Sequence, residues 1–199
     1  MASSTRQPSS SGNRAREPRF FEQPKILFHR LRKKLPRQLV GAIDETGVIN
    51  RHALSNLVLL PGYDSEMLWA VLALFNSDIA NWWFVKRYGP LMEVGGFKIQ
   101  TIPLPSSWDS VWKSLARDAH NIADAASKAK LSLDDHVSEV HRRSIGNSKA
   151  QIEKAIADAY GLSRGDLAHI EKSYKELLAR SKRSTEETQD DEESELEEA

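Results

Sequence analysis

The chain has 199 residues, 40% of them hydrophobic, with 28 basic residues, 28 acidic residues and no cysteine. This composition allows one globular domain with tails, and it excludes disulfides and thiolate metal sites. No apolar run approaches the length that spans a bilayer, and the N-terminus lacks the apolar core of a secretory signal. We therefore expect a cytoplasmic protein without a membrane partner.

The formal net charge of zero hides an uneven distribution. Nine acids and no base lie between Glu186 and Glu198, so the rest of the chain carries 28 basic against 19 acidic residues. Residues 1–60 alone hold eleven Lys and Arg against four Asp and Glu. Such asymmetry is typical of a protein that binds a polyanion. Surface charge that only keeps the protein soluble explains it equally well.

A basic arm and several short strands are expected in the first 60 residues. Residues 1–18 are rich in Ser, Gly, Arg and Pro, which predicts disorder. Bulky apolar residues between turn residues predict four strands, at Lys25–Arg30, Leu39–Ile43, Val48–Ile49 and Leu57–Leu60. The second and third flank the turn Asp44–Gly47 and are predicted to form a hairpin, and the fourth is predicted to be buried.

Two apolar helices that meet at a polar break are predicted next. Asp64 or Ser65 can cap the first helix. Ser77 interrupts that helix and can cap the second, which ends at Gly89. Residues 97–102 then alternate between apolar and polar side chains, which predicts a return to strand.

The remainder is predicted to be helical. The apolar spacing predicts a helix over residues 108–130, then a shorter one over Gln151–Tyr160 that Ser148 caps and Gly161 ends, and a last helix capped by Ser163. The fold expected is therefore α+β, with a small, mostly antiparallel sheet and a helix pair followed by a helical C-terminal region. Its predicted segments are a disordered basic arm (1–18), a sheet-containing domain (19–106), a helical region (107–182) and a disordered acidic tail (183–199).

Several short pieces occur in a fixed order along residues 24–105. They are Pro24-Lys25-Ile26-Leu27 with Arg30, then Asp44, the run Asn56–Leu60, Leu72-Ala73-Leu74-Phe75-Asn76-Ser77, Lys98-Ile99 and Ile102-Pro103-Leu104-Pro105. In this order and spacing the stretch resembles the TaqI-like C-terminal specificity domain. That domain is the target-recognition region of adenine-specific modification methyltransferases and of fused restriction–modification enzymes. The segment Ile152–Ile170 resembles the helix pair that often ends such proteins, so the resemblance covers about two-thirds of the chain.

This resemblance implies recognition of double-stranded DNA without catalysis. The catalytic domain of such methyltransferases carries an Asn-Pro-Pro-Tyr type motif, and nothing in this sequence matches it. Gly95-Gly96 alone is too weak a signal for a loop that holds S-adenosylmethionine. The implied partner is therefore a methyltransferase catalytic domain or subunit, which would hold that cofactor. The chain itself is expected to need none.

Candidate DNA-binding residues are the cations and amides of the specificity segment. Clustered cations neutralise phosphates, arginine pairs with guanine edges, and asparagine or glutamine pairs with adenine edges. The candidates are Arg30, Arg32, Lys33, Lys34, Arg37, Asn50, Arg51, His52, Lys86, Arg87, Lys98 and Gln100. Each of these residues also has an ordinary alternative, as a turn or surface side chain. Of the neighbouring aromatic residues, Trp82 is expected in the core more often than Trp83.

Two other functions are compatible with the sequence. Gly161 between two helices fits a helix-turn-helix regulator in which Ser163, Arg164 and His169 face the DNA. A plain packed helix pair fits the same pattern. Alternatively, the helical half could dock a protein partner with no DNA contact. The six histidines show no spacing that is typical of a metal site.

Overall fold

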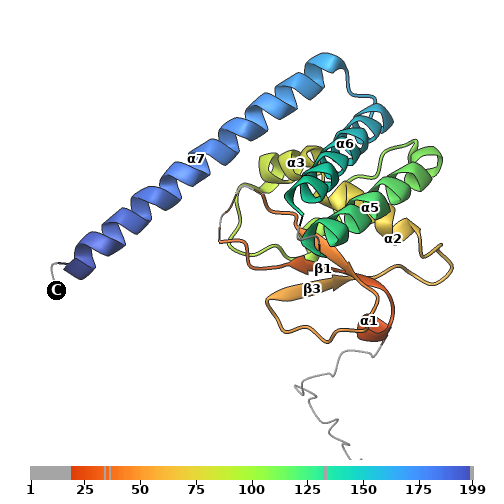
Figure 1. Ribbon diagram of the computed structural model, residues 1–199, viewed down its shortest axis with the longest axis horizontal. Coiled ribbons are helices and arrows are strands. Elements are labelled where there is room, and N and C mark those ends of the chain that lie inside the picture. Colours follow the sequence, from red (N-terminus) through yellow and green to blue (C-terminus); the bar gives the residue numbers. More distant parts are fainter. Residues whose placement is uncertain (1–18, 34, 36, 132–133, 198–199) are drawn as a thin grey trace, which may run out of the picture.

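A small sheet packed against helices forms the body of the protein (Figure 1). The computed structural model describes residues 19–33, 35, 37–131 and 134–197. The strands are β1 (Lys25–His29), β2 (Gly41–Asp44) and β3 (Leu54–Leu57). The helices are α1 (Arg19–Glu22), α2 (Met67–Asn76), α3 (Asp78–Tyr88), α4 (Gly96–Ile99), α5 (Trp108–Leu131), α6 (Asp135–Ala159) and α7 (Arg164–Glu197). The predicted α+β class, with its helix pair and helical C-terminal region, is confirmed; the basic arm 1–18 lies outside the described residues.

The sheet order differs from the predicted hairpin. β1 lies in the centre and pairs antiparallel with β2 on one side and β3 on the other. Val48–Ile49 is not a strand. The Asp44 carboxylate accepts hydrogen bonds from the Thr46 N–H at 3.0 Å and the Val48 N–H at 2.9 Å. The chain therefore turns around a side chain, and the Val48 N–H is not available to a strand ladder.

A buried ion pair fixes the same end of the sheet. Lys25 is fully buried and Asp44 is 7% exposed. The Lys25 ammonium donates to Asp44 and, at 2.7 Å, to the Phe21 carbonyl. The hydrogen bond from Lys25 holds the pKa of the Asp44 carboxyl well below its ordinary range, and the bonds from Thr46 and Val48 lower it further. β1, the turn after β2 and helix α1 are thereby joined at one point.

Two further strand predictions are wrong. The strand predicted at Leu57–Leu60 is β3, which spans Leu54–Leu57 instead. It was predicted to be buried, but it is half-buried because it lies at an edge of the sheet. Residues 97–102 form the helical turn α4 and a following turn, with local bonds such as Gln100 N–H to Gly96 O at 3.1 Å. The alternating pattern failed here because these backbone groups are satisfied locally, without a neighbouring strand. Phe97 is consequently 80% exposed.

The junction of α2 and α3 is hydrogen-bonded to the segment that enters β2. The Asn76 side chain accepts from the Gly41 N–H and donates to the Gly41 carbonyl, both at 2.9 Å. Asn81, fully buried, pairs in the same two-way manner with Leu39 at 2.7 and 3.1 Å. The Ser77 hydroxyl caps α3 by accepting from the Ala80 N–H at 3.0 Å, as predicted. The Phe75-Asn76-Ser77 end of the Leu72–Ser77 piece therefore has a structural role.

The C-terminal helices confirm some predicted ends and correct others. Gly161, at φ 69°, ends α6 in a Schellman motif, with Leu162 N–H bonded to Ala157 O at 2.9 Å. Ser163 caps α7 through reciprocal bonds with Asp166. Ser148 is not a cap, because α6 is continuous and buries this small residue in its interior. Helix α7 extends to Glu197. The predicted boundary between the helical region and the acidic tail, at residue 183, therefore lies inside a helix.

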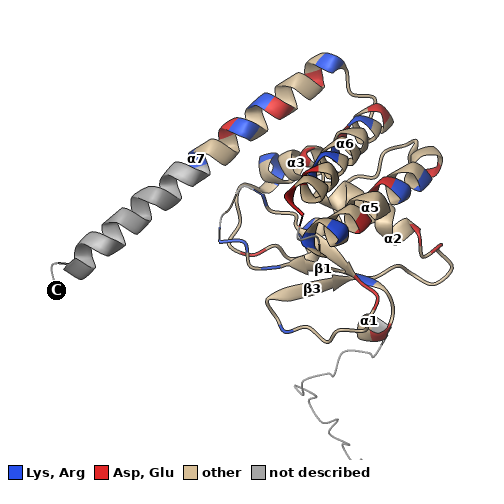
Figure 2. Ribbon diagram, in the orientation of Figure 1, with Lys and Arg blue, Asp and Glu red and all other residues tan. Residues whose placement is uncertain are grey.

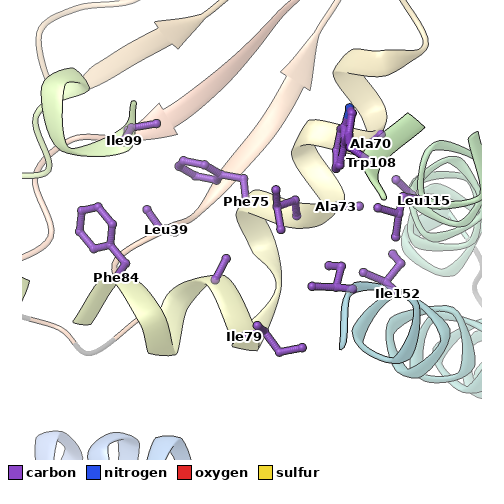
Figure 3. Packing of buried hydrophobic residues seen from close by; sticks show 14 of the residues in the cluster. Leu39, Ala70, Ala73, Phe75, Ile79, Phe84, Ile99, Trp108, Leu115 and Ile152 are labelled. Atoms are coloured by element: carbon purple, nitrogen blue, oxygen red, sulfur yellow. The ribbon is translucent and has the colours of Figure 1, made fainter. Parts of the chain in front are cut away.

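One hydrophobic core joins the sheet region to the helical region (Figure 3). On one side of α2, Phe84, Leu39 and Ile99 gather around Phe75, against the sheet. On the other side, Ala70 and Ala73 face α5 and α6. These two helices contribute Trp108, Leu115 and Ile152 to the core. Because α2 contributes to both sides, the segments 19–106 and 107–182 share a core.

Glu153 of α6 ties the helical region to the junction of α2 and α3. Its carboxylate accepts from the N–H groups of Asp78 at 2.5 Å and Ile79 at 3.3 Å, at the N-terminus of α3. Burial raises the pKa of Glu153 to about 7; the neighbouring Asp78 carboxylate also raises it, while the two N–H groups lower it. Glu153 therefore takes up its proton near neutral pH in the folded protein.

The stability of the protein is expected to fall as pH rises from 4.5 towards 8. In this range the unfolded chain has lost the Glu153 proton while the folded chain still holds it, so raising the pH favours unfolding. The loss from this group is on the order of 2–3 kcal/mol. Glu153→Gln should flatten this fall in urea denaturation measured between pH 4.5 and 8. Glu171→Gln on the exposed face of α7 should not, and an unchanged slope in Glu153→Gln would contradict the assignment.

Candidate nucleic-acid interface

One end of the sheet gathers several of the predicted DNA-binding residues. The Arg30 N–H donates to the Ala53 carbonyl at 3.0 Å, which brings the segment after β1 beside the segment before β3. Arg51 and His52 precede that carbonyl and are exposed. Lys33 lies two residues after Leu31, which pairs with Glu93 in an isolated β-bridge. Its side chain is exposed, and its backbone has a positive φ of 47°. Three chain segments, around residues 30–33, 50–53 and 92–94, therefore meet at this end of the sheet.

Three of the candidate arginines, Arg30, Arg32 and Arg37, bind other groups of the protein. Arg30 pairs with Glu93. Arg32 donates to the Arg37 carbonyl at 3.0 and 2.6 Å, and burial, followed by the nearby Arg37 charge, lowers the pKa of Arg32. Arg37 pairs with Asp78 at 2.6 Å and donates to the Asn76 carbonyl. Arg32 and Arg37 hold the loop before β2, and Arg30 joins the segment after β1 to Glu93. Lys34 lies outside the described residues.

A second group of cations lies at the C-terminal end of α3. Lys86 and Arg87 are exposed in its last turn. The Lys98 ammonium lies 5.4 Å from the centre of the Tyr88 ring, and the Tyr88 hydroxyl is 2.6 Å from Thr101 Oγ1. Cations favour a helix C-terminus in any case. In Figure 2 the blue end of α3 and the blue loop beside β1 lie on the same side of the view.

The two amide candidates have different surroundings. Asn50 donates to the Leu54 carbonyl at 2.8 Å, so it holds the loop before β3 and is not free to pair with a base. Gln100 is exposed at the end of α4 and lines a groove beside β3. Within the described residues, no hydrogen bond engages the Gln100 side chain. Gln100 is therefore the better placed of the two to contact a ligand.

The groove beside β3 was not predicted from the sequence. It has a volume of about 650 Å³ and lies between β3 and α4. Its lining includes Phe20, Ser55, Asn56, Leu57, Ile99 and Gln100. The one feature of the sequence that could have indicated this groove is Asn56, a polar residue within an apolar run. The sequence analysis used Asn56 only as part of the Asn56–Leu60 piece of the resemblance.

A second cavity, of about 450 Å³, lies where the α2–α3 junction meets α5 and α6. Arg37, Asp78, Lys149 and Glu153 contribute charges to its lining, beside apolar side chains such as Ile122. Arg37, Asp78 and Glu153 are engaged with one another or with the α3 N-terminus. In the described part of the chain, no three His, Asp or Glu side chains come close enough to hold a metal ion.

The predicted helix-turn-helix residues have other contacts. His169 lies edge-on to the Trp82 ring, with 6.4 Å between centroids, and Trp82 donates to the Ser173 hydroxyl at 2.6 Å. Helix α7 thus packs on α3, where Trp82 belongs to the edge of the core as expected. Arg164 is exposed at the start of α7, beside the Ser163–Asp166 cap.

Searches of protein-family models, curated proteins and solved structures find nothing that matches this chain. Among the described residues, no helix is both long enough and apolar enough to cross a membrane.

Proposed function

We propose that the chain is a DNA target-recognition module of a restriction–modification system or a related defence methyltransferase. The observation that carries the proposal is a set of exposed cations with no carboxylate partner in the described structure: Lys33, Arg51, Lys86 and Arg87. Lys33 and Arg51 lie where the segments around residues 30–33, 50–53 and 92–94 meet, and Lys86 and Arg87 lie in the last turn of α3. The resemblance of residues 24–105 to TaqI-like specificity domains supports the same function.

The proposed mechanism separates positioning from reading. Exposed cations contact phosphates and fix the module on the duplex, while neutral polar side chains contact base edges. Methyl transfer to adenine, with S-adenosylmethionine as donor, belongs to a separate catalytic domain or subunit. The module alone is therefore expected to bind DNA and not to methylate it, and its place would be the cytoplasm.

Removing exposed cations is expected to weaken DNA binding and its salt dependence together. Replacing Lys86 and Arg87 by alanine removes up to two phosphate contacts. The slope of log K against log salt should then become shallower by up to about 2, uniformly across DNA sequences. Arg51→Ala should reduce the slope by about 1. Fluorescence anisotropy with a labelled random-sequence duplex, measured from 50 to 300 mM salt (roughly the range where such contacts dominate), tests both.

The matched control is the double variant of Lys130 and Lys154 to alanine, which removes two exposed cations, on α5 and α6, that likewise have no carboxylate partner among the described residues. It should leave the salt slope unchanged. A larger loss in the double variant of Arg164 and His169 would instead favour the helix-turn-helix function. If the unmodified chain shows no salt-sensitive binding to any duplex, with or without a methyltransferase, it is not a DNA-binding module, and an interaction subunit becomes the better account.

A further inference from the structure

Phe97 projects into solvent from a backbone that is fixed on both sides. Its side chain is 80% exposed, although phenylalanine is among the residues most often buried. Val94, before it, is fully buried, and its N–H donates to the Arg30 carbonyl at 2.7 Å. Ile99, after it, lies in the core near Phe75 (Figure 3). The exposure of Phe97 is therefore built into the fold, because the chain on either side of it is anchored.

The ring of Phe97 is free to contact a partner. The ring contacts of this region join Tyr88 to Phe84, with 5.1 Å between centroids, and Tyr88 to Trp83 at 6.4 Å. In the described part of the chain, no aromatic ring lies against Phe97. The two residues before it are glycines, which have no side chain that could cover it. Most of a large, flat, apolar surface is thus left to the solvent.

The turn that carries Phe97 is held against a cationic helix end. The Lys98 ammonium lies 5.4 Å from the centre of the Tyr88 ring, and the Tyr88 hydroxyl is 2.6 Å from Thr101 Oγ1. These contacts join α4 to the last turn of α3. Lys86 and Arg87 are exposed in that same turn. Three cations therefore belong to the two elements that meet beside Phe97.

The charge of this region suits a polyanion. Between residues 83 and 105 the sequence has one carboxylate, Glu93, and it pairs with Arg30. Within the described structure, Lys86, Arg87 and Lys98 form no ion pair with a carboxylate. A partner that offered only an apolar surface to Phe97 would leave these cations without counter-charges. DNA offers both groups at once, since its phosphates attract cations and its base pairs present flat apolar faces.

We propose that Phe97 inserts as an apolar wedge between two neighbouring base pairs of double-stranded DNA, while Lys86, Arg87 and Lys98 contact the flanking phosphates. The inference rests on the proposed DNA-binding function and deepens it, because it names the side chain that distorts the duplex. Phenylalanine is one of the residues that proteins insert between base steps, which partly unstacks and kinks the DNA. Such a wedge makes binding depend on how easily a base step opens.

The test compares two labelled duplexes of equal length, one fully paired and one with a central mismatch, by fluorescence anisotropy with the full chain. The unmodified chain should bind the mismatched duplex at least about fivefold more tightly, because a mismatched base pair costs less to unstack. Phe97→Ala should bring the two affinities within about twofold of each other, and Phe97→Leu, which keeps an apolar wedge, should retain part of the preference. The salt slope should be the same in all three proteins, because the cations are unchanged.

Tyr63→Ala is the matched control. Tyr63 is also an exposed aromatic residue, at 58%, but the acidic residues Asp64 and Glu66 follow it closely. Its replacement should leave both affinities unchanged. Because Phe97 is so exposed, Phe97→Ala should unfold at the same urea concentration as the unmodified chain, which separates loss of the wedge from loss of the fold.

Three outcomes would overturn the inference and leave the proposed function in place. One is salt-sensitive binding with equal affinity for the two duplexes. Another is a preference for the mismatched duplex that Phe97→Ala retains. The third is self-association of the chain that Phe97→Ala abolishes, measured by analytical ultracentrifugation, with no change in the ratio of the two affinities; Phe97 would then be a contact between copies of the chain. Absence of salt-sensitive binding to either duplex would overturn the proposed function together with the inference.

Discussion

Lys25→Met is expected to destabilise the protein by about 3–5 kcal/mol, the range found when one partner of a buried ion pair is removed. Lys25 is fully buried, and its ammonium joins Asp44 to the Phe21 carbonyl. Without it, the Asp44 carboxylate stays buried with only its hydrogen bonds to Thr46 and Val48. Asp44→Asn should cost a similar amount, because it leaves the Lys25 charge without its carboxylate. Urea denaturation at pH 7 measures both changes.

The double variant of Lys25→Met and Asp44→Asn should cost clearly less than the sum of the single changes, because no unpaired charge remains. Acid titration gives an independent check. The depressed pKa of Asp44 contributes stability that is present above its ordinary value of 3.8 and is lost as pH falls through the folded value. In Lys25→Met this loss should become smaller. Strict additivity of the two single changes would show that the pair is not coupled.

The sequence predicted the helical parts of the fold better than the sheet. The residue type alone was sufficient to predict the start of α3 at Ser77, the end of α6 at Gly161 and the start of α7 at Ser163. Strand pairing depends on distant contacts, and the side chain of Asp44 uses the N–H groups that a hairpin would need. The alternation over residues 97–102 predicted a strand, but it had no neighbouring strand with which to pair.

The candidate interface could be predicted in composition but not in detail. Sequence reasoning selects cations and amides by type, and it cannot tell a free arginine from one that is engaged within the protein. Arg32 and Arg37 are used in shaping the loop before β2, whereas Arg51 is exposed. The groove between β3 and α4 could not be foreseen, because its lining comes from segments that lie far apart in the sequence.

The pieces that carry the family resemblance have mainly structural roles. Lys25 and Asp44 pair across β1 and β2, Asn76 joins α2 to Gly41 of β2, and Ser77 caps α3. The exposed cations and the groove amide Gln100 lie between or beside these pieces. A scaffold fixed by one set of residues and a binding surface formed by another would let the proposed recognition module change its target without losing its fold.

Asn81→Leu is expected to destabilise the protein by about 3–5 kcal/mol, because it removes both hydrogen bonds that satisfy the Leu39 backbone. Leu39 is fully buried, and its N–H and carbonyl bond to the Asn81 side chain at 2.7 and 3.1 Å. Leucine has a similar size but offers no polar atom, so two buried backbone groups would be left without partners. The Asn81 amide also donates to the Ser77 carbonyl at 2.9 Å, so the start of α3 would loosen as well.

Two measurements separate this mechanism from general loss of packing. Urea denaturation gives the free energy of unfolding, with Asn147→Leu as the control, because Asn147 is exposed on α6 and its replacement should change stability by less than about 0.5 kcal/mol. Amide hydrogen exchange should show the Leu39 N–H losing protection beyond the global change. If the Leu39 amide stays as protected as its neighbours in Asn81→Leu, the Asn81 side chain does not hold this segment, and the other contacts of the loop before β2 are sufficient.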